Sequence, residues 1–446
     1  MTERVFLHVG APKSGTTYLQ RVLDANRAAL ADAGVLVVGK RHLDRIHAAM
    51  AVREDPRLAD LPASAAASWS RLVAQVADWK GACAVLSYEL FAVASAEQAA
   101  RALADLAAYE VHVVVSARDL GRSVVSAWQE RLKFGLTTPL EEWRPKPESV
   151  EGSEWGWRTL DPSGVAERWG ASLPPERVHV VTAPRPEAGP SELWKRFADA
   201  CGLGAVPVDL DLPRVNESVG LVQAELLRRV NGRLRHEIRG SRERSVWIRD
   251  LLAQEVLAPL GHERIGVPEP VSAEAGQVYE RAVARIQQAG YAVHGDLADL
   301  APASSASSSA SSSGRLPSEV TEAELTDAAA ACISALVVTM RDRAGAGKRG
   351  NASGDAGPGV VPVVPPGSRA RVRNLAARAL GPYDNLRVRR LAARVQELER
   401  EVQEARRLHL RVATLDDVVR ELLLDPAVQD AGVTWEALQA YRRESL

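Results

Sequence analysis

The sequence predicts an α/β protein, in which a parallel β-sheet flanked by helices is followed by a disordered linker and a C-terminal helical segment. From residue 4 to about residue 297, short apolar runs alternate with amphipathic stretches. This alternation is typical of a parallel sheet covered by helices on both faces. The expected strands are Val5–Val9, Val35–Val38, Cys83–Ser87, Val111–Ser116 and Val178–Thr182. Stretches such as Ala96–Ala107 and Arg122–Phe134 have the helical spacing of apolar residues and are the expected helices.

Composition narrows the class of protein. The chain has 446 residues, enough for two or three domains. Its net charge of −1 gives no overall attraction to nucleic acid or to an anionic membrane. The three cysteines lack the spacing of a zinc site or a disulfide framework, which suits a reducing compartment. The first strand follows the initiator segment directly, and no uninterrupted apolar run approaches about 20 residues. We therefore expect a cytoplasmic protein without a signal peptide or a transmembrane helix.

The second half of the chain changes in composition. A serine tract over Ala303–Glu319 cannot bury apolar surface and is expected to be a flexible linker. The predicted parts are a domain at 1–297, this Ser-rich linker at 298–321, a short helix at 322–342, a Gly/Pro-rich linker at 343–370 and C-terminal helices at 371–446. Within the last part, apolar residues from Val388 to Ala405 follow the 3-4 spacing of a coiled-coil seam, and His409 then weakens it. The seam predicts a short coiled coil and a homo-oligomer.

The stretch "VFLHVGAPKSGTTYLQRVL" passes from the first strand through a small-residue turn into a helix. Gly10 and Gly15 have the spacing of a phosphate-binding loop, G-x-x-x-x-G-K-[ST]. The lysine of that motif is replaced by Thr16, and Lys13 lies before the second glycine instead. Such a turn presents backbone N–H groups and a helix N-terminus to an anion. The sequence thus predicts a P-loop-type site for one phosphate, without the lysine that a triphosphate needs.

The segment Lys13-Ser14-Gly15-Thr16-Thr17 resembles the 5′-phosphosulfate loop of the sulfotransferases that use 3′-phosphoadenosine-5′-phosphosulfate (PAPS), of bacterial type. A second signature of that family follows a later strand: an Arg and a Ser, separated by seven residues on a strand–loop–helix, hold the 3′-phosphate. Arg118 and Ser126 match it, after the fourth apolar run. A guanidinium can form two parallel hydrogen bonds to a phosphate. The resemblance covers residues 4 to about 220, and its first motif is the specific one.

The resemblance implies transfer of the PAPS sulfonate to a hydroxyl of a carbohydrate or another small metabolite, by in-line attack and without a metal. Lys13 would stabilise the departing phosphate oxygen. Residues 13–17, Arg118 and Ser126 would bind the donor. Two alternatives remain open: a P-loop kinase, for which no Mg²⁺ partner is evident, and a degenerate P-loop scaffold whose C-terminal helices bind a partner.

The general base that would accept the hydroxyl proton has three candidates. Glu89 follows the third apolar run, at the carboxyl end of a strand where ligands bind in open α/β sheets. Some members of the family use a Glu near the sulfonate and others a His. His42 and His47 follow the second run and are the rival candidates. Glu89 is the preferred one, although a charge at a helix N-terminus explains it equally simply.

Two further stretches could contact ligands. The loop 137–159 carries Trp143, Trp155 and Trp157, which suit either stacking on a sugar or half-buried packing. Arg214, Asn216 and Ser218 precede a long helical pattern and suit either the nucleotide pocket or a helix cap. The expected partner is thus a hydroxyl acceptor, such as a glycan. Contact with nucleic acid or a membrane is not expected.

Overall fold

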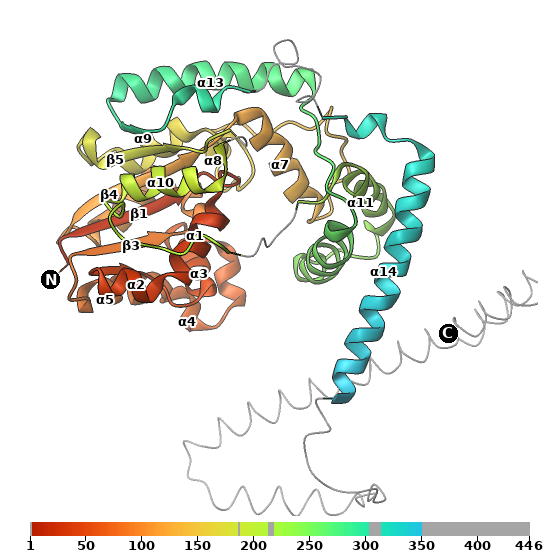
Figure 1. The fold of residues 1–446 in the computed structure, drawn as a ribbon, viewed down its shortest axis with the longest axis horizontal. Helices are drawn as coiled ribbons and strands as arrows, with labels where there is room; N and C mark the ends of the chain where they lie inside the picture. The colour runs from red at the N-terminus through yellow and green to blue at the C-terminus, as the bar shows by residue number, and fades with distance from the viewer. Residues whose placement is uncertain (1, 186–187, 213–217, 303–313, 350–446) are drawn as a thin grey trace, which may run out of the picture. The chain divides into compact units, whose positions relative to one another are not determined.

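The computed structural model describes residues 2–185, 188–212, 218–302 and 314–349, all within the unit formed by Met1–Ala352. A six-stranded parallel sheet lies at its centre, in the order β2-β3-β1-β4-β5-β6 (Figure 1). The strands are β1 (Arg4–Gly10), β2 (Val35–Val37), β3 (Cys83–Ser87), β4 (Glu110–Ala117), β5 (Val178–Thr182) and β6 (Ala292–His294). The predicted α/β class, with a parallel sheet flanked by helices, and all five predicted strands are confirmed. The sixth strand was not predicted, because three residues are too few to show a pattern.

Both faces of the sheet are covered, because alternate residues of each strand point to opposite sides. On β1, Val5, Leu7 and Val9 pack into one core cluster. Phe6 packs into a second cluster on the other face. The first cluster is closed by α3 (His42–Val52), α5 (Ser68–Asp78), η2 (Glu89–Val93), α6 (Ala96–Ala104) and α9 (Pro162–Gly170). The second is closed by α1 (Thr16–Ala25), α2 (Arg27–Asp32) and α10 (Pro190–Ala200).

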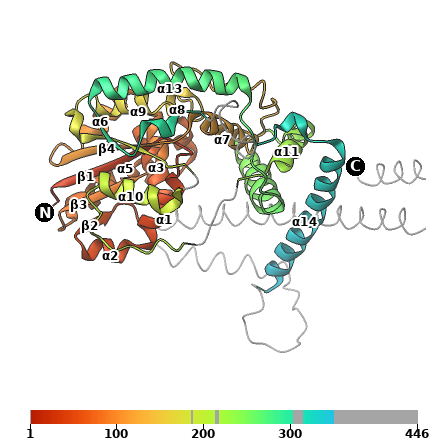
Figure 2. The ribbon, with the colours of Figure 1, turned by 45° about the horizontal axis from the view of Figure 1, so that its top comes forward.

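Helix α7 (Leu120–Leu132) lies between two smaller cores beyond the edge of the sheet. One of these cores contains α8 (Trp157–Leu160) and α13 (Glu269–Ala289), which extends over α7 and α9 in Figure 2. The other contains α11 (Leu221–Leu234), the π-helical segment η5 (Arg244–Leu257) and α14 (Glu322–Arg349). The remaining short elements are η1 (Pro56–Asp60), α4 (Ala63–Ala66), η3 (Pro175–Arg177), α12 (Ser241–Glu243), η6 (Ala258–Leu260), η7 (Leu297–Leu300) and η8 (Pro317–Glu319).

The helix predicted at 322–342 is present as α14. Its first turns pack against the domain, since Leu325 and Ala328 are buried together with Leu226 and Leu227 of α11. The two helices lie side by side in Figures 1 and 2. By length and composition alone, residues 322–343 are also apolar enough to cross a membrane. The sequence did not predict this, because polar residues interrupt the apolar positions of this segment. The predicted domain boundary at residue 297 stays a prediction. The predicted linker at 343–370 lies mostly outside the described residues, and the coiled coil lies wholly outside them.

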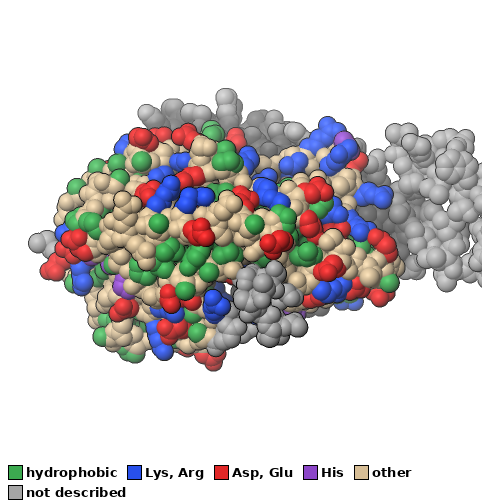
Figure 3. Space-filling view, turned by 90° about the horizontal axis from the view of Figure 1, so that it is seen from above, with side chains coloured by type: hydrophobic (Ala, Val, Ile, Leu, Met, Phe, Trp, Pro, Cys, Tyr) green, Lys and Arg blue, Asp and Glu red, His purple; other side chains and the backbone are tan. Residues whose placement is uncertain are grey.

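Charges are mixed over the surface of the domain. Lys and Arg side chains are interspersed with Asp and Glu side chains over the face that Figure 3 shows, which runs along the side of α13. This distribution agrees with the net charge of −1 for the whole chain.

Candidate active site

The glycine-rich loop leaves β1 at the centre of the sheet, where the chain connections change direction. β1 pairs with β3 on one side and with β4 on the other. The chain leaving β1 continues to β2, whereas the chain leaving β4 continues to β5 on the opposite side. Ligands of open α/β sheets bind at the carboxyl ends of strands at such a switch point. The loops after β1 and β4 are therefore the ones to examine for a ligand site.

The backbone of the loop after β1 has the shape of an anion cradle. Gly10, Lys13 and Gly15 all have positive φ, at 136°, 67° and 91°. A Cβ on Gly15 would lie 2.4 Å from Leu193 Cδ2, and a Cβ on Gly10 would lie 2.9 Å from the carbonyl oxygen of Glu89. Both glycines are thus required by φ and by close packing. Gly15 is the N-cap of α1 and has no side chain to cap the helix, so the first N–H groups of α1 are open to an anion.

A chain of buried hydrogen bonds holds this loop from below. The Ser14 hydroxyl donates to the carbonyl oxygen of Ala11 at 2.6 Å and lies 2.6 Å from the Ser116 hydroxyl. Ser116 is 2.9 Å from His8 Nε2, and His8 Nδ1 is 2.7 Å from the Ser87 hydroxyl. Burial lowers the pKa of His8 to about 3, so its ring is neutral at neutral pH. The side chain of Ser14 is therefore engaged in shaping the loop.

Lys13 is one of two lysines on the same carboxylate. Its Nζ donates to Glu130 Oε1 at 2.9 Å, and Lys133 Nζ donates to the same oxygen at 2.8 Å. Burial alone would raise the pKa of Glu130, but the charges of Lys13 and Lys133 outweigh it and lower this pKa to about 2. Burial lowers the pKa of Lys133, against the opposing charge of Glu130. The group carries one positive charge in excess and is half-buried, which favours an anion beside it.

Arg118 and Ser126 are in contact, as the second signature predicts. Arg118 directly follows β4, and its Nη2 donates to Ser126 Oγ at 2.5 Å and to the carbonyl oxygen of Arg122 at 2.9 Å. These partners are neutral. Burial lowers the pKa of Arg118 to about 10, which shows that its charge is poorly solvated. The charge of Asp119 opposes this shift, and a phosphate would add a second negative charge beside Arg118.

Glu89 lies at the same edge of the sheet as the glycine-rich loop. It opens η2, and Gln20 of α1 donates from Nε2 to its Oε2 at 2.7 Å. Because Gln20 is one helical turn after Thr16, this hydrogen bond ties Glu89 to the helix whose N-terminus faces the anion cradle. The close approach of the Glu89 carbonyl to Gly10 brings the two loops together from the other side.

The two histidines differ in their surroundings. His42 opens α3, and its ring meets Tyr88 edge-on, with ring centroids 5.6 Å apart. Desolvation and the charge of Arg45 lower the pKa of His42, while the charge of Glu89 opposes them. His47 is influenced instead by Asp44, Arg71 and Arg41, with desolvation again lowering its pKa. His42 is therefore close to Glu89, whereas the surroundings of His47 are on another part of α3.

Comparison with known proteins gives two solved structures of related architecture. The chain is similar to a sulfotransferase from Alicyclobacillus acidocaldarius, at 13% identity and a TM-score of 0.34 over 56% of this chain and 96% of that one. It is also similar to the sulfotransferase domain from the curacin biosynthetic pathway, at 14% identity and a TM-score of 0.27 over 48% of this chain and 79% of that one. Residues 391–445 match the family Domain of unknown function (DUF6752) and lie outside the described residues. No curated protein matches the chain.

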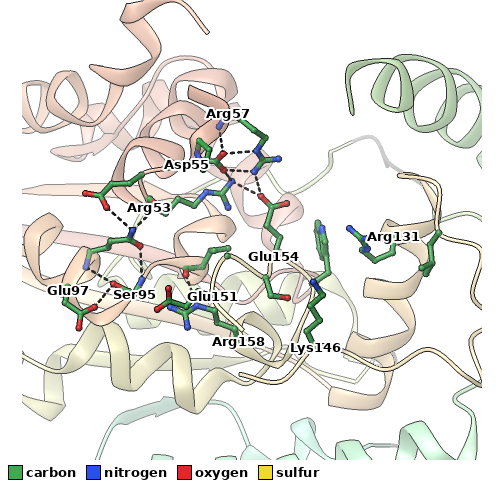
Figure 4. Close-up of a pocket in the computed structure, with 18 of the residues that line it drawn as sticks. Arg53, Asp55, Arg57, Ser95, Glu97, Arg131, Lys146, Glu151, Glu154 and Arg158 are labelled. Carbon is green, nitrogen blue, oxygen red and sulfur yellow. Dashed lines mark hydrogen bonds and ion pairs between the residues drawn. The ribbon is translucent and has the colours of Figure 1, made fainter. Parts of the chain in front are cut away.

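A cavity of about 960 Å³ is lined by residues of the segments 53–57, 93–101, 131–136 and 143–158, and its lining does not include Lys13, Glu89 or Arg118 (Figure 4). Trp143 and Trp155 line it, and both are half-buried and pack against the cores around α7, as the packing interpretation of this loop predicts. Trp157 instead packs in the core and donates from Nε1 to Glu274 Oε1 at 2.6 Å. The loop is fastened by Glu154, which accepts from Arg53 at 2.7 Å and pairs with Arg57. Of the other predicted ligand contacts, Arg214 and Asn216 lie outside the described residues.

Several residues of the site were not predicted. Glu130 and Lys133 are three apart on a helical pattern, where a sequence shows only a surface ion pair. Gln20 was hidden among the polar positions of the first helix. His8 left a usable signal, because it interrupts an otherwise apolar strand and a buried histidine needs hydrogen-bond partners.

Proposed function

We propose that the protein is a sulfotransferase that takes the sulfonate from PAPS. One observation carries the proposal: two cationic sites, each beside a helix, lie at the carboxyl ends of the neighbouring strands β1 and β4. Neighbouring strands are about 4.8 Å apart, so a single nucleotide can contact both loops. PAPS carries phosphate groups at two ends of its ribose, and the two sites would take one each.

The residues of the two loops fit these groups. The N–H groups of residues 14–17 would surround the 5′-phosphate, and Arg118 with Ser126 would hold the 3′-phosphate. PAPS supplies an activated sulfonate whose leaving group is a phosphate oxygen. An acceptor hydroxyl would attack the sulfur, so that a new S–O bond forms while the bond to the phosphate oxygen breaks. Glu89 would accept the hydroxyl proton, and Lys13 would neutralise the charge that grows on the leaving oxygen.

A P-loop kinase is the second candidate function, and the position of Lys13 in this chain argues against it. A P-loop kinase places Lys after the second glycine, toward the β- and γ-phosphates, and this chain has Thr16 there. ATP lacks a 3′-phosphate and offers no such partner to the half-buried Arg118 beside Ser126. In a scaffold without a ligand, Arg118 would have its neutral hydrogen-bond partners and the charge of Asp119.

Calorimetry with adenosine 3′,5′-bisphosphate tests the proposal. We expect binding without Mg²⁺, and we expect Arg118→Ala to weaken it by at least tenfold because a charge-assisted hydrogen bond to phosphate is lost. Arg281→Ala, an exposed position on α13, is the matched control and should bind as the native chain does. Tighter, Mg²⁺-dependent binding of ATP would favour the kinase, and binding of neither nucleotide would favour the scaffold.

A further inference from the structure

The cavity in Figure 4 is lined by one residue each of η2 and α7, the elements that contain Glu89 and Glu130. Val93, which lines it, ends the 3₁₀ helix that begins at Glu89, about 8 Å away along the helix axis. Arg131, which also lines it, directly follows Glu130, the partner of Lys13. Neither Glu89 nor Lys13 lines the cavity, but Val93 and Arg131 connect its wall to η2, which begins at Glu89, and to α7, which carries the partner of Lys13.

Basic side chains outnumber acidic ones in the part of the cavity wall that is not neutralised by ion pairs. Seven basic and five acidic residues line the cavity. Asp55 and Glu154 pair with Arg53 and Arg57, and Glu54 pairs with Arg101 at 2.8 Å. Arg144 pairs with Glu274 at 3.7 Å, which leaves three basic residues, Arg131, Lys146 and Arg158, against two acidic ones, Glu97 and Glu151.

The remaining charges are separated in space. Within the described part of the chain, Arg131 and Lys146 have no ion-pair partner, and both are exposed. Figure 4 shows these two on one side of the cavity and Glu97 on the opposite side, beside Ser95. Ser95 Oγ donates to Glu97 Oε2 at 2.7 Å, so this carboxylate is engaged locally. The side formed by Arg131 and Lys146 can thus attract a negative group without facing Glu97.

The rest of the wall suits a hydroxylated ring. Trp143 and Trp155 are half-buried, and each contributes an apolar surface with one N–H. Gln98 and Ser153 add small polar groups. The volume of about 960 Å³ is at the upper end of the usual range for small-molecule sites, which gives room for more than one ring. A simple alcohol or a phenol would leave the basic residues and most of this volume unused.

We propose that the cavity binds an acidic oligosaccharide as the sulfonate acceptor, with Arg131 and Lys146 holding its negative groups and Trp143 and Trp155 its ring faces. The acceptor role rests on the proposed sulfotransferase function. The binding itself does not, because it requires only the cavity and can be measured without the donor.

Direct titration of the full chain tests the binding. A hyaluronan tetrasaccharide and a galacturonate tetramer are the acidic probes, and chitotetraose is the uncharged one, all at 50 mM salt. We expect at least one acidic probe to bind at least tenfold more tightly than chitotetraose, and to weaken at 500 mM salt because exposed charges are screened. Failure of both acidic probes, or equal binding of chitotetraose, overturns the proposal.

Variants locate the site. Lys146→Gln and Arg131→Gln should each weaken the acidic probe by about 5- to 10-fold, since each removes one charge-assisted contact. Lys195→Gln is the matched control, because Lys195 is exposed on α10 and pairs with Glu192 outside the cavity. If Lys146→Gln and Arg131→Gln bind the probe as the native chain does, the saccharide lies elsewhere and the proposal is wrong.

A parallel titration with adenosine 3′,5′-bisphosphate separates the two proposals. If the bisphosphate binds and the acidic probes do not, the donor assignment stands and the acceptor assignment fails. If the acidic probes bind, Lys146→Gln weakens their binding and the bisphosphate does not bind at all, the cavity is a saccharide site and the sulfotransferase function fails.

Discussion

Lys13 is held by a carboxylate that it shares, and this limits the charge it can offer. Its Nζ and that of Lys133 both donate to Glu130 Oε1. One carboxylate cannot neutralise two ammonium groups, so the cluster keeps one positive charge in a half-buried position. Charge is stabilised best by groups that are already oriented before the reaction begins. Under the proposed function, Glu130 would act on Lys13 as a positioning residue and would hold the ammonium in place before the donor binds.

Substitutions should separate the roles of Lys13 and Glu89. Lys13→Ala should lower turnover by about 10²–10³-fold and weaken donor binding less, because its charge is needed most in the transition state. Glu89→Gln should leave donor affinity intact and lower turnover by about 10²–10⁴-fold, the usual contribution of a general base. Steady-state kinetics with calorimetry of the bisphosphate measures both effects.

His42 provides the internal comparison for that experiment. It lies close enough to Glu89 for the two charges to interact, and its lowered pKa keeps the ring neutral at neutral pH. Near-full turnover in Glu89→Gln together with inactivity in His42→Ala would transfer the role of base to the histidine. His47→Ala serves as the control, because its surroundings are Asp44, Arg71 and Arg41.

The residues of the donor loops could be predicted, whereas those that support them could not. Lys13, Arg118 and Ser126 lie at fixed spacings beside strand ends, and spacing is visible in a sequence. Glu130 meets Lys13 only because α7 returns to the carboxyl end of β1, and that approach depends on packing. Gln20 likewise reaches Glu89 across two elements that are 69 positions apart.

Among the elements, α7 contributes most to the site. Ser126 and Glu130 are four residues apart and therefore lie on one face of the helix. The same helix buries Leu120 and Val124 in one core and Trp128 and Leu132 in another. Its position is thus fixed from two sides, and with it the distance between the two proposed anion sites.

The packing of α14 against α11 determines where the chain can be shortened without loss of stability. A fragment ending at Leu297 loses Val320, Leu325 and Ala328, which are buried against α11. Their burial is worth about 4 kcal/mol, so this fragment should melt on the order of 10 °C lower than the full chain. A fragment ending at Arg343 keeps these contacts and should melt within a few degrees of the full chain. Differential scanning calorimetry measures both melting temperatures. Equal melting temperatures for the two fragments would contradict this prediction.

The sequence predicted α14 as a helix but not its attachment to the domain. Periodicity reports which residues share a face, and Leu325 and Ala328 do not by themselves name α11 as their partner. The serine tract before the helix suggested independence. The coiled coil and the oligomer expected from the last segment stay predictions.

For the whole molecule, buried histidines set the response to acid. His8 lies between Ser87 and Ser116 and against the ring of Phe197, with ring centroids 5.1 Å apart. Burial lowers its pKa to about 3. A second group joins three strands, where His179 Nε2 is 2.9 Å from His112 Nδ1 and His179 Nδ1 is 3.0 Å from His294 Nε2. Burial, followed by the charges of these two neighbours, lowers the pKa of His179 to about 4.

The free energy of unfolding should therefore fall as the pH falls from about 6.5 to 3. In that window the unfolded chain protonates His8 and the folded chain does not, so acid favours the unfolded state. The full stabilisation is present above pH 6.5, and His8 alone accounts for at most about 5 kcal/mol. Urea unfolding at several pH values measures the slope.

His8→Asn should flatten that slope even if the variant is less stable at every pH. His236→Asn, at an exposed position, should retain the native slope. An unchanged slope in His8→Asn would mean that other groups control the acid response.

The hydrogen-bond chain below the glycine-rich loop has a consequence for how this protein can evolve. Ser14, Ser116, His8 and Ser87 belong to the loop and to three adjacent strands, and each satisfies its neighbour. Loss of one partner leaves a buried polar atom without a hydrogen bond, which lowers the free energy of unfolding by about 1–3 kcal/mol. Replacement of both partners with apolar groups of similar shape is nearly neutral. The effect of a substitution at one of these positions thus depends on the residues at the others. A lineage that abandons this arrangement has to cross less stable intermediates, so the four positions are expected to be inherited as a set.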